Sequence, residues 1–329
     1  MKIIALEEHT VTPGVQAAWA SVPTAAQDGV EHALHGPVAE MLADLGERRL
    51  RGMDDAGVDV QVLSVTTPGV QNLSAADAPG VARAANDIIA AAVQSHPDRF
   101  QGFATLPTPD PAAAADELRR SVCELGMKGA MLCGRTGQRN MDLPEFAEIY
   151  RTAAALHAPL YVHPQLPVMA VREALYSGFG EPLDTLLSQF GLGWHYEAGI
   201  ALLRLILAGT FDRYPELQVI VGHWGEVVLF YLDRISSMPA EALKLDRPLQ
   251  DYFTQNVYYT GSGILSQRYL RWTLEVVGVE RVMYSVDYPY RHLGDGAARR
   301  FLQDAELEPA DRERIAHGNW EQLTAAISC

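Results

Sequence analysis

The sequence has few of the features that direct a chain to a membrane or to nucleic acid. It contains no run of about 18 or more apolar residues, and its N-terminus lacks a basic region followed by an apolar stretch, so neither a membrane span nor a secretory signal is predicted. Only 26 Lys and Arg stand against 41 Asp and Glu, and they do not cluster, which excludes a phosphate-backbone binder. We therefore predict a cytoplasmic protein without nucleic-acid or membrane partners.

Cysteine is also scarce. Cys123, Cys133 and Cys329 are odd in number and lack the spacing of metal ligands. We expect reduced, mostly structural thiols.

Short apolar runs alternate with helical patterns along the whole chain. Eight runs are candidates for buried parallel strands, at residues 2–6, 58–65, 102–106, 129–133, 159–163, 218–222, 257–261 and 282–286. Apolar residues at three- and four-residue spacing predict helices over 43–56, 80–96, 111–125, 144–157, 197–213, 226–238, 264–277 and 295–305, with a last helix over 310–326.

Eight β–α units predict an α/β fold of the (β/α)8 or TIM-barrel type, as a single domain over residues 1–329. The alternative is an open doubly wound sheet, whose dinucleotide-binding form needs a glycine-rich turn after the first strand. The residues at that point are Glu7-Glu8-His9-Thr10, which favours the barrel.

Two connections, residues 10–42 and 165–196, are too long for plain loops. Both follow the carboxyl ends of predicted strands, where barrel active sites are built, so we interpret them as lids and substrate walls. Phe179, Phe190 and Trp194 make the second suitable for covering an apolar or aromatic ligand. Contact with another subunit is an alternative role for these aromatics, and the two roles are compatible.

Polar side chains follow four of the predicted strands, and in a barrel the carboxyl ends of these strands meet at one rim. Glu7 and His9 are two residues apart, so they face the same side of a strand while Glu8 points away. Taken alone, this motif also fits a solvated acidic turn. His163, His223 with Glu226, and Asp287 follow three further strands. Their convergence predicts a metal site.

These motifs resemble the metal-dependent decarboxylases of the amidohydrolase superfamily, which act on γ-resorcylate, 2,3-dihydroxybenzoate, 5-carboxyvanillate and aminocarboxymuconate semialdehyde. The resemblance covers nearly the whole chain and rests on Leu6-Glu7-Glu8-His9, Asp44-Leu45-Gly46-Glu47-Arg48-Arg49, Phe211-Asp212-Arg213-Tyr214-Pro215, Gly222-His223-Trp224-Gly225-Glu226 and Asp287-Tyr288-Pro289. It implies one divalent ion and no organic cofactor. The implied ligands are Glu7, His9, His163 and Asp287, with zinc the first choice and manganese the second.

The resemblance also implies that His223 and Glu226 form an acid/base and orienting pair, although Glu226 alone is also typical of a first-turn acid on a helix. Arg234 would cross a subunit boundary to reach substrate, implying a homodimer or homotetramer; its alternative is a surface pair with Asp233 or a helix neighbour. Thr66 and Tyr290 match substrate-lining positions. His195 either touches substrate or, with Trp194 and Glu197, closes the lid and caps the following helix.

The expected reaction is non-oxidative decarboxylation of a hydroxylated aromatic or related unsaturated carboxylic acid, with Asp287 as proton donor. Glu7 stands where many hydrolases of the superfamily have His, which favours the decarboxylases. The same ligands permit a hydrolase or hydratase that uses a metal-activated water, and a non-catalytic binding module is a third interpretation. The relatives' extra Arg has no counterpart at Leu34, His35 and Gly36, which leaves the particular substrate open.

Overall fold

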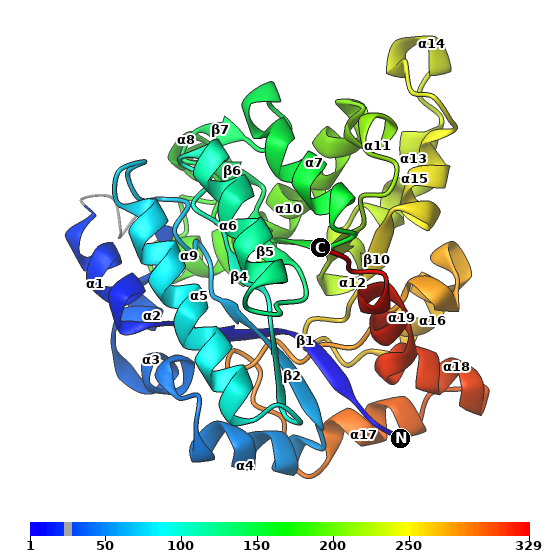
Figure 1. The fold of residues 1–329 in the computed structure, drawn as a ribbon. Helices are drawn as coiled ribbons and strands as arrows, with labels where there is room; N and C mark the ends of the chain where they lie inside the picture. Colours follow the sequence, from blue (N-terminus) through cyan, green and yellow to red (C-terminus); the bar gives the residue numbers. More distant parts are fainter. Residues whose placement is uncertain (23–27) are drawn as a thin grey trace.

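The computed structural model describes residues 1–22 and 28–329, and it contains the predicted barrel of parallel strands inside a layer of helices (Figure 1). Besides β1 and β2, five of the described parallel strands contain three or four residues each, and β4 contains two. The short strands β6 and β7 form a small antiparallel hairpin. The bounds are β1 Ile4–Thr10, β2 Val60–Val65, β3 Phe100–Gly102, β4 Ala104–Thr105, β5 Ala130–Cys133, β6 Arg135–Thr136, β7 Arg139–Asn140, β8 Leu160–His163, β9 Val219–Val221 and β10 Val257–Tyr259.

The barrel is made of two parallel sheets, ordered β1-β2-β3 and β10-β9-β8-β5-β4. β3 and β4 are one barrel strand interrupted at Phe103, since β3 pairs with β2 and β4 pairs with β5. The predicted strand 282–286 is reduced to two bridges, Tyr259↔Val282 and Leu6↔Ser285, which close the barrel between β10 and β1. The α/β barrel prediction is confirmed, with a less regular eighth strand than expected.

Helices cover the outside of the barrel and also occupy both long connections. Their bounds are α1 Pro13–Ser21, α2 Glu31–Leu34, α3 Gly36–Ala43, α4 Glu47–Ala56, α5 Ala78–Ser95, α6 Pro111–Cys123, η2 Pro144–Phe146, α7 Ala147–Ala155, α8 Met169–Leu175, α9 Leu183–Leu186, η3 Leu187–Gly191, α10 Gly193–Leu207, α11 Thr210–Arg213, α12 His223–Glu226, η4 Leu229–Tyr231, α13 Leu232–Ser236, α14 Ala240–Leu243, α15 Leu249–Gln255, α16 Gln267–Val277, η5 Val279–Arg281, α17 Ala297–Gln303, α18 Pro309–Glu313, η6 Arg314–Gly318 and α19 Asn319–Ala325. None of the described helices is long and apolar enough to cross a membrane.

Several helix predictions need correction. The segment 226–238, expected as one helix, is divided among α12, η4 and α13, and the residues 223–227 have left-handed or other non-helical angles. By contrast, the expected helix 310–326 is present as one continuous helical run over residues 309–325, in which the π-helical turn η6 lies between α18 and α19. The connection 10–42 contains α1, α2 and α3, and its residues 23–27 lie outside the described part of the chain. Apolar periodicity located the helices but could not show where tertiary contacts break them.

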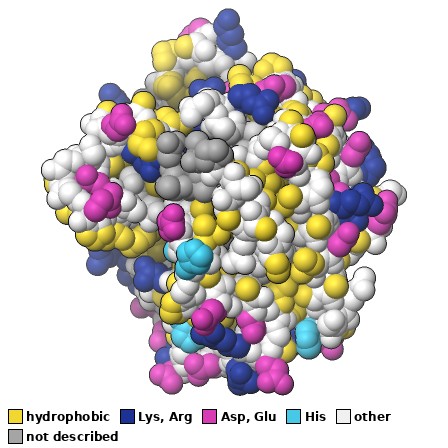
Figure 2. All heavy atoms as spheres, turned by 90° about the vertical axis from the view of Figure 1, so that its left-hand side faces the viewer, with side chains coloured by type: hydrophobic (Ala, Val, Ile, Leu, Met, Phe, Trp, Pro, Cys, Tyr) yellow, Lys and Arg dark blue, Asp and Glu magenta, His cyan; other side chains and the backbone are white. Residues whose placement is uncertain are grey.

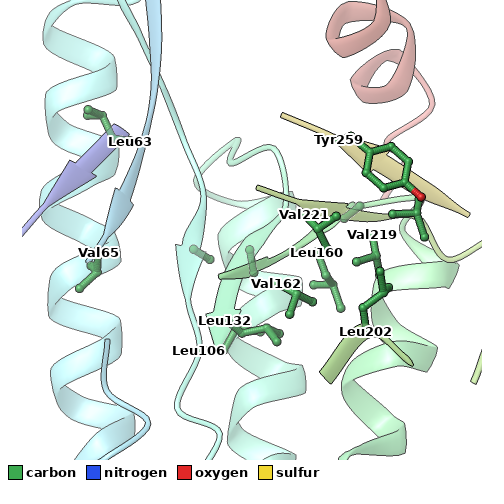
Figure 3. Close-up of a cluster of buried hydrophobic side chains, with 14 of the residues drawn as sticks. Leu63, Val65, Leu106, Leu132, Leu160, Val162, Leu202, Val219, Val221 and Tyr259 are labelled. Atoms are coloured by element: carbon green, nitrogen blue, oxygen red, sulfur yellow. The ribbon is translucent and has the colours of Figure 1, made fainter. Parts of the chain in front are cut away.

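The core lies in two layers that follow the period-two alternation of the strands. Figure 3 shows Leu160, Val162, Val219 and Val221 gathered against the helix that carries Leu202, on the outer side of the barrel. The intervening residues face inward, and the inner layer contains Ile4, Leu6, Val60, Val62, Phe103, Met131, Tyr161, Ile220, Met283, Trp320 and Leu323. This alternation also turns His163, two residues after Tyr161, toward the interior.

A disulfide between Cys123 and Cys329 corrects the expectation of three reduced thiols; Cys133 is free and buried. The bond joins the end of α6 to the last residue of the chain across 206 positions. Spacing in the sequence could not reveal this pair, because the contact depends on how the C-terminal segment packs. The disulfide restricts the unfolded chain more than the folded one.

We expect Cys123→Ser to lower the free energy of unfolding by about 2–4 kcal/mol under non-reducing conditions, because the unfolded chain regains the entropy of a very long loop. Urea titration followed by circular dichroism measures the change. The same titration in dithiothreitol is the control, where the variant and the parent should coincide. A difference that persists in the reductant would show that the serine acts on packing instead.

Candidate metal centre and active site

Strand ends with unusual backbone angles build the centre. The β1–β2 register shifts between Ala5 and Glu8, which marks an irregularity in β1. Glu7 at this irregularity has φ 65°, and Asp287 also has φ 65°. Such left-handed angles cost a residue other than glycine about 1–3 kcal/mol and persist only where surrounding contacts hold them. The backbone is therefore bent where the candidate ligands project.

Glu7, His9 and His163 bring one donor atom each to a common point. These three atoms lie within 4.8 Å of one another, and all three residues are buried. Asp287 lies beside them, with its Oδ1 3.3 Å from His9 Nε2. Glu7 Oε1 is 3.3 Å from His163 Nε2. Two carboxylates and two imidazoles suit a divalent ion such as zinc or manganese.

Hydrogen bonds leave the inward-facing atoms free for such an ion. Among the described residues, neither Glu7 Oε1 nor His9 Nε2 has a hydrogen-bond partner although both are buried. Glu7 Oε2 accepts hydrogen bonds from Tyr161 at 2.5 Å and from the Ser262 hydroxyl. His163 Nδ1 donates to the carbonyl of Pro164 at 2.7 Å, which leaves Nε2 with its lone pair. The residues present therefore fit a divalent cation.

The electrostatics of the four groups agree with this fit. Burial raises the pKa of Glu7 to about 8 and that of Asp287 to about 7. Burial also lowers the pKa of His9 to about 3 and holds the pKa of His163 well below its usual value. A bound divalent cation would stabilise the carboxylate forms of Glu7 and Asp287, which burial disfavours, and it would bind the two imidazoles in the neutral form that burial favours.

Glu226 joins two histidines beside the metal candidates. Its carboxylate is fully buried and accepts hydrogen bonds from His223 Nδ1 at 2.7 Å and His195 Nδ1 at 2.9 Å. Glu226 is thus a buried anion between imidazoles, and its role is not that of an exposed first-turn acid. Burial alone would lower the pKa of His223, but the Glu226 charge and hydrogen bond raise it to about 9. Glu226 thus favours the cationic form of His223.

We expect Glu226→Gln to lower the pKa of His223 from about 9, because burial then acts against only the weaker charges of Glu7 and Asp287. Nuclear magnetic resonance titration of the metal-free protein, with labelled histidine, measures this value. Glu197→Gln is a matched control, since Glu197 pairs with Arg135 and does not contact His223. A His223 pKa that stays near 9 in Glu226→Gln would contradict the assignment.

A cavity of about 250 Å³ opens beside these groups. Phe190 and Trp194, from the connection 165–196 and the start of α10, form part of its wall, whereas Phe179, which was also expected to cover a ligand, is exposed and does not line it. The full lining is Phe190, Trp194, His195, His223, Ser262, Ile264, Asp287, Tyr290 and Arg291. Apolar rings opposite a few polar groups suit a small aromatic ligand.

Of the four residues predicted to contact substrate, two line the cavity and two do not. Tyr290 and His195 line the cavity, but both ring nitrogens of His195 already face acceptors, Glu226 and the Phe190 carbonyl. Thr66 lies behind Tyr290, where the two hydroxyls are 2.6 Å apart. Arg234 on α13 is exposed, and within residues 1–22 and 28–329 it has neither the predicted pair with Asp233 nor a place on the cavity wall.

Several residues at this site were missed from the sequence, among them Ser262, Ile264 and Arg291 on the cavity wall and His32 behind it. His32, from the connection 10–42, lies with its Nε2 2.9 Å from the Tyr290 hydroxyl, a contact across 258 positions that no local pattern signals. Arg291 lines the cavity and lowers the pKa of Asp287 electrostatically. Its position shortly after the Asp287 motif was a signal that could have identified it.

Comparison with known proteins identifies the family. The family model described as amidohydrolase matches residues 19–323. The chain belongs to the amidohydrolase family. Decarboxylase orsB of Emericella nidulans is 36% identical over 98% of this chain and 96% of its own length. This full-length match puts the chain among the decarboxylases of the family, as the resemblance predicted.

Solved structures of decarboxylases in the amidohydrolase family share the whole fold. The 5-carboxyvanillate decarboxylase of Sphingomonas paucimobilis is 31% identical, with a TM-score of 0.90 and full coverage of both chains. A dihydroxybenzoic acid decarboxylase from Polaromonas, solved with bound manganese and the inhibitor 2-nitroresorcinol, is 32% identical with a TM-score of 0.85, covering 98% of this chain and 97% of that one. These matches support an enzyme with a metal site.

Proposed function

We propose that this amidohydrolase-family enzyme removes the carboxylate of a hydroxylated aromatic acid as carbon dioxide, with the help of one divalent ion. The observation that carries the proposal is the buried donor set, whose unpartnered atoms Glu7 Oε1 and His9 Nε2 lie next to a cavity with aromatic walls. The similar decarboxylases act on acids of this class, and one was solved with an aromatic inhibitor.

Glu7, His9, His163 and Asp287 are the proposed ligands of the ion. Zinc is the expectation from the sequence, and mixed nitrogen and oxygen donors also suit manganese. The manganese in the Polaromonas relative favours manganese here. When bound, either ion would supply Lewis-acid stabilisation for negative charge that develops on a ring oxygen.

Asp287 is the proposed proton donor and His223 the proposed anchor. Both line the cavity. His223 Nε2 has no hydrogen-bond partner among the described residues, while Nδ1 is held by Glu226, so the cationic ring is available to the negative charge of a substrate. Phe190, Trp194 and Ile264 are proposed to hold the apolar ring and to keep water from it.

The reaction step balances with these groups alone. The Asp287 carboxyl proton moves to the ring carbon that bears the substrate carboxylate, and a ring electron pair forms the new carbon–hydrogen bond. The bond between this carbon and the carboxylate then breaks, its electrons restore the aromatic ring, and carbon dioxide leaves. Asp287 remains as a carboxylate and takes its next proton from water.

We also propose a cytoplasmic enzyme that is one domain over residues 1–329 and forms a homodimer or homotetramer. Large apolar side chains are exposed in and near the connection 165–196, including Leu175, Phe179 and Phe190, which supports a subunit contact there. Figure 2 shows hydrophobic side chains at the surface among charges of both signs.

Arg234 would then complete a neighbouring subunit's site, because it does not reach the cavity of its own chain. Sedimentation of wild type and Phe179→Asp tests the contact.

The function is tested by incubating the metal-loaded protein with a panel of hydroxybenzoates and lactones. We expect carbon dioxide release from at least one ortho-hydroxybenzoate, and none from its para-hydroxy isomer, since only the ortho hydroxyl lies beside the departing carboxylate. Lactone opening without carbon dioxide release would replace the proposal with the hydrolase alternative. A protein that takes up the ion yet turns over neither group of compounds would favour the binding-module interpretation.

A further inference from the structure

A buried chain of three polar side chains lies behind the metal candidates and takes no part in the roles described above. Arg49 on α4, Gln61 on β2 and Glu8 on β1 are at most 2% exposed. Gln61 connects the other two, since its Oε1 accepts from Arg49 Nη1 at 3.2 Å and its Nε2 donates to Glu8 Oε2 at 2.9 Å. Buried polar chains of this kind are costly unless every member is satisfied.

Glu8, at one end of this row of hydrogen-bonded side chains, holds the backbone immediately before Asp287. Glu8 Oε1 accepts a hydrogen bond from the backbone N–H of Val286 at 2.8 Å. Val286 directly precedes Asp287, and Glu8 directly follows Glu7. Glu7 and Asp287 are the two candidates with φ 65°, so this bond joins the immediate neighbours of two strained residues. Strain of this kind persists only when surrounding contacts hold it.

The other end fixes His9. Arg49 Nη2 donates to the His9 carbonyl at 2.5 Å, and its guanidinium lies over the Tyr288 ring, 4.6 Å from the centroid. The N–H of His9 in turn donates to the carbonyl of Tyr288 at 2.7 Å. Arg49 therefore contacts the residue that follows Asp287 as well as His9 itself. The planar guanidinium presents several hydrogen-bond donors in a fixed geometry, so it is well suited to hold His9 and Tyr288 in fixed relative positions.

We propose that Arg49, Gln61 and Glu8 are positioning residues that set the spacing of His9 and Asp287, and through it the affinity of the site for its divalent ion. None of the three lines the cavity, so they act on the ligands and not on substrate. The inference rests on the proposed metal site and adds to it the groups that hold its geometry. Loss of such supporting contacts costs about 10- to 100-fold in metal affinity.

Gln61→Met tests the proposal, because methionine keeps the length and volume of the side chain while removing both hydrogen bonds. We expect the dissociation constant for Mn²⁺, measured by calorimetry on the metal-free protein, to rise about 10- to 100-fold. The electron paramagnetic resonance spectrum of bound Mn²⁺ should broaden, since the ligands are less uniformly placed. At saturating Mn²⁺, activity should return to a large extent.

Asn86→Met is the matched control. Asn86 is a fully buried amide that connects the Thr105 backbone to Glu117, and none of these hydrogen bonds involves a metal candidate. The Asn86→Met variant should have a lower melting temperature, as Gln61→Met should, but its affinity for Mn²⁺ should be unchanged. Glu8→Gln, which keeps the shape and replaces one carboxyl oxygen with an amide nitrogen, provides a second variant if Gln61→Met does not fold.

The outcomes separate this inference from the proposed function. Wild-type Mn²⁺ affinity in a folded Gln61→Met or Glu8→Gln would overturn the positioning role and leave the metal site standing. A wild-type protein that binds neither Mn²⁺ nor Zn²⁺ would overturn the metal site and the positioning role together. Weaker affinity in Asn86→Met of the same size would show that affinity follows general stability, which also overturns the role.

Discussion

Replacing Asp287 with asparagine should reduce kcat by roughly 10²- to 10⁴-fold, the usual contribution of a positioned proton donor. Asparagine keeps the size of the side chain and an oxygen that can still face the ion, but it has no carboxyl proton to give to the ring carbon. Asp287 lines the cavity and lies 3.3 Å from His9 Nε2, so its loss affects the reacting end of the site directly. Steady-state rates of carbon dioxide release measure the effect.

Asp295→Asn is the matched control for this substitution. Asp295 follows in the same segment and is exposed, so its variant should keep wild-type rates. Metal content and melting temperature of Asp287→Asn, measured in parallel, separate loss of the proton donor from loss of the ion. Rapid turnover by a metal-loaded Asp287→Asn would remove Asp287 from the role of proton donor.

Removal of the ion should have a comparable effect. A protein dialysed against a strong chelator should lose at least about 10²-fold in activity, because Lewis-acid stabilisation is worth several kcal/mol in the transition state. Adding Mn²⁺ or Zn²⁺ should restore turnover. It should also raise the melting temperature, since an ion that binds only the folded state stabilises it by about 2.7 kcal/mol at a hundred times the dissociation constant.

Magnesium is the control ion for this experiment. It prefers oxygen ligands, whereas the candidate site offers His9 and His163 nitrogens, so Mg²⁺ should restore little activity and little stability. Full activity after chelation, with metal content below one tenth of the protein concentration by elemental analysis, would contradict a metal-dependent reaction.

The regular geometry of barrel strands explains why much of the site could be predicted from the sequence. Strand side chains alternate faces, and barrel strands end at one rim, so the positions of Glu7, His9, His163, His223 and Asp287 at apolar run ends already implied that they meet. Gln61 was also visible in the sequence as a polar residue within the apolar run 58–65, but its role was not recognised.

Other features depend on contacts between residues far apart in the sequence. The irregularity at Glu7, the bond between Glu8 and Val286 across 278 positions, and the His32 contact to Tyr290 all form only when the barrel closes. The disulfide between Cys123 and Cys329 is of the same kind. Local periodicity carries no information about such pairs.

By itself, the sequence determined the barrel and the strand ends that carry the candidate ligands, because alternation and helical periodicity are local properties of the chain. The family followed from the resemblance of its motifs to those of known decarboxylases. Only the tertiary structure decided which donor atoms stay without partners, that Glu226 holds two histidines, and that Arg234 lies outside the cavity of its own chain. Those properties depend on burial and on distances across the closed barrel, which follow from the packing of all the elements together.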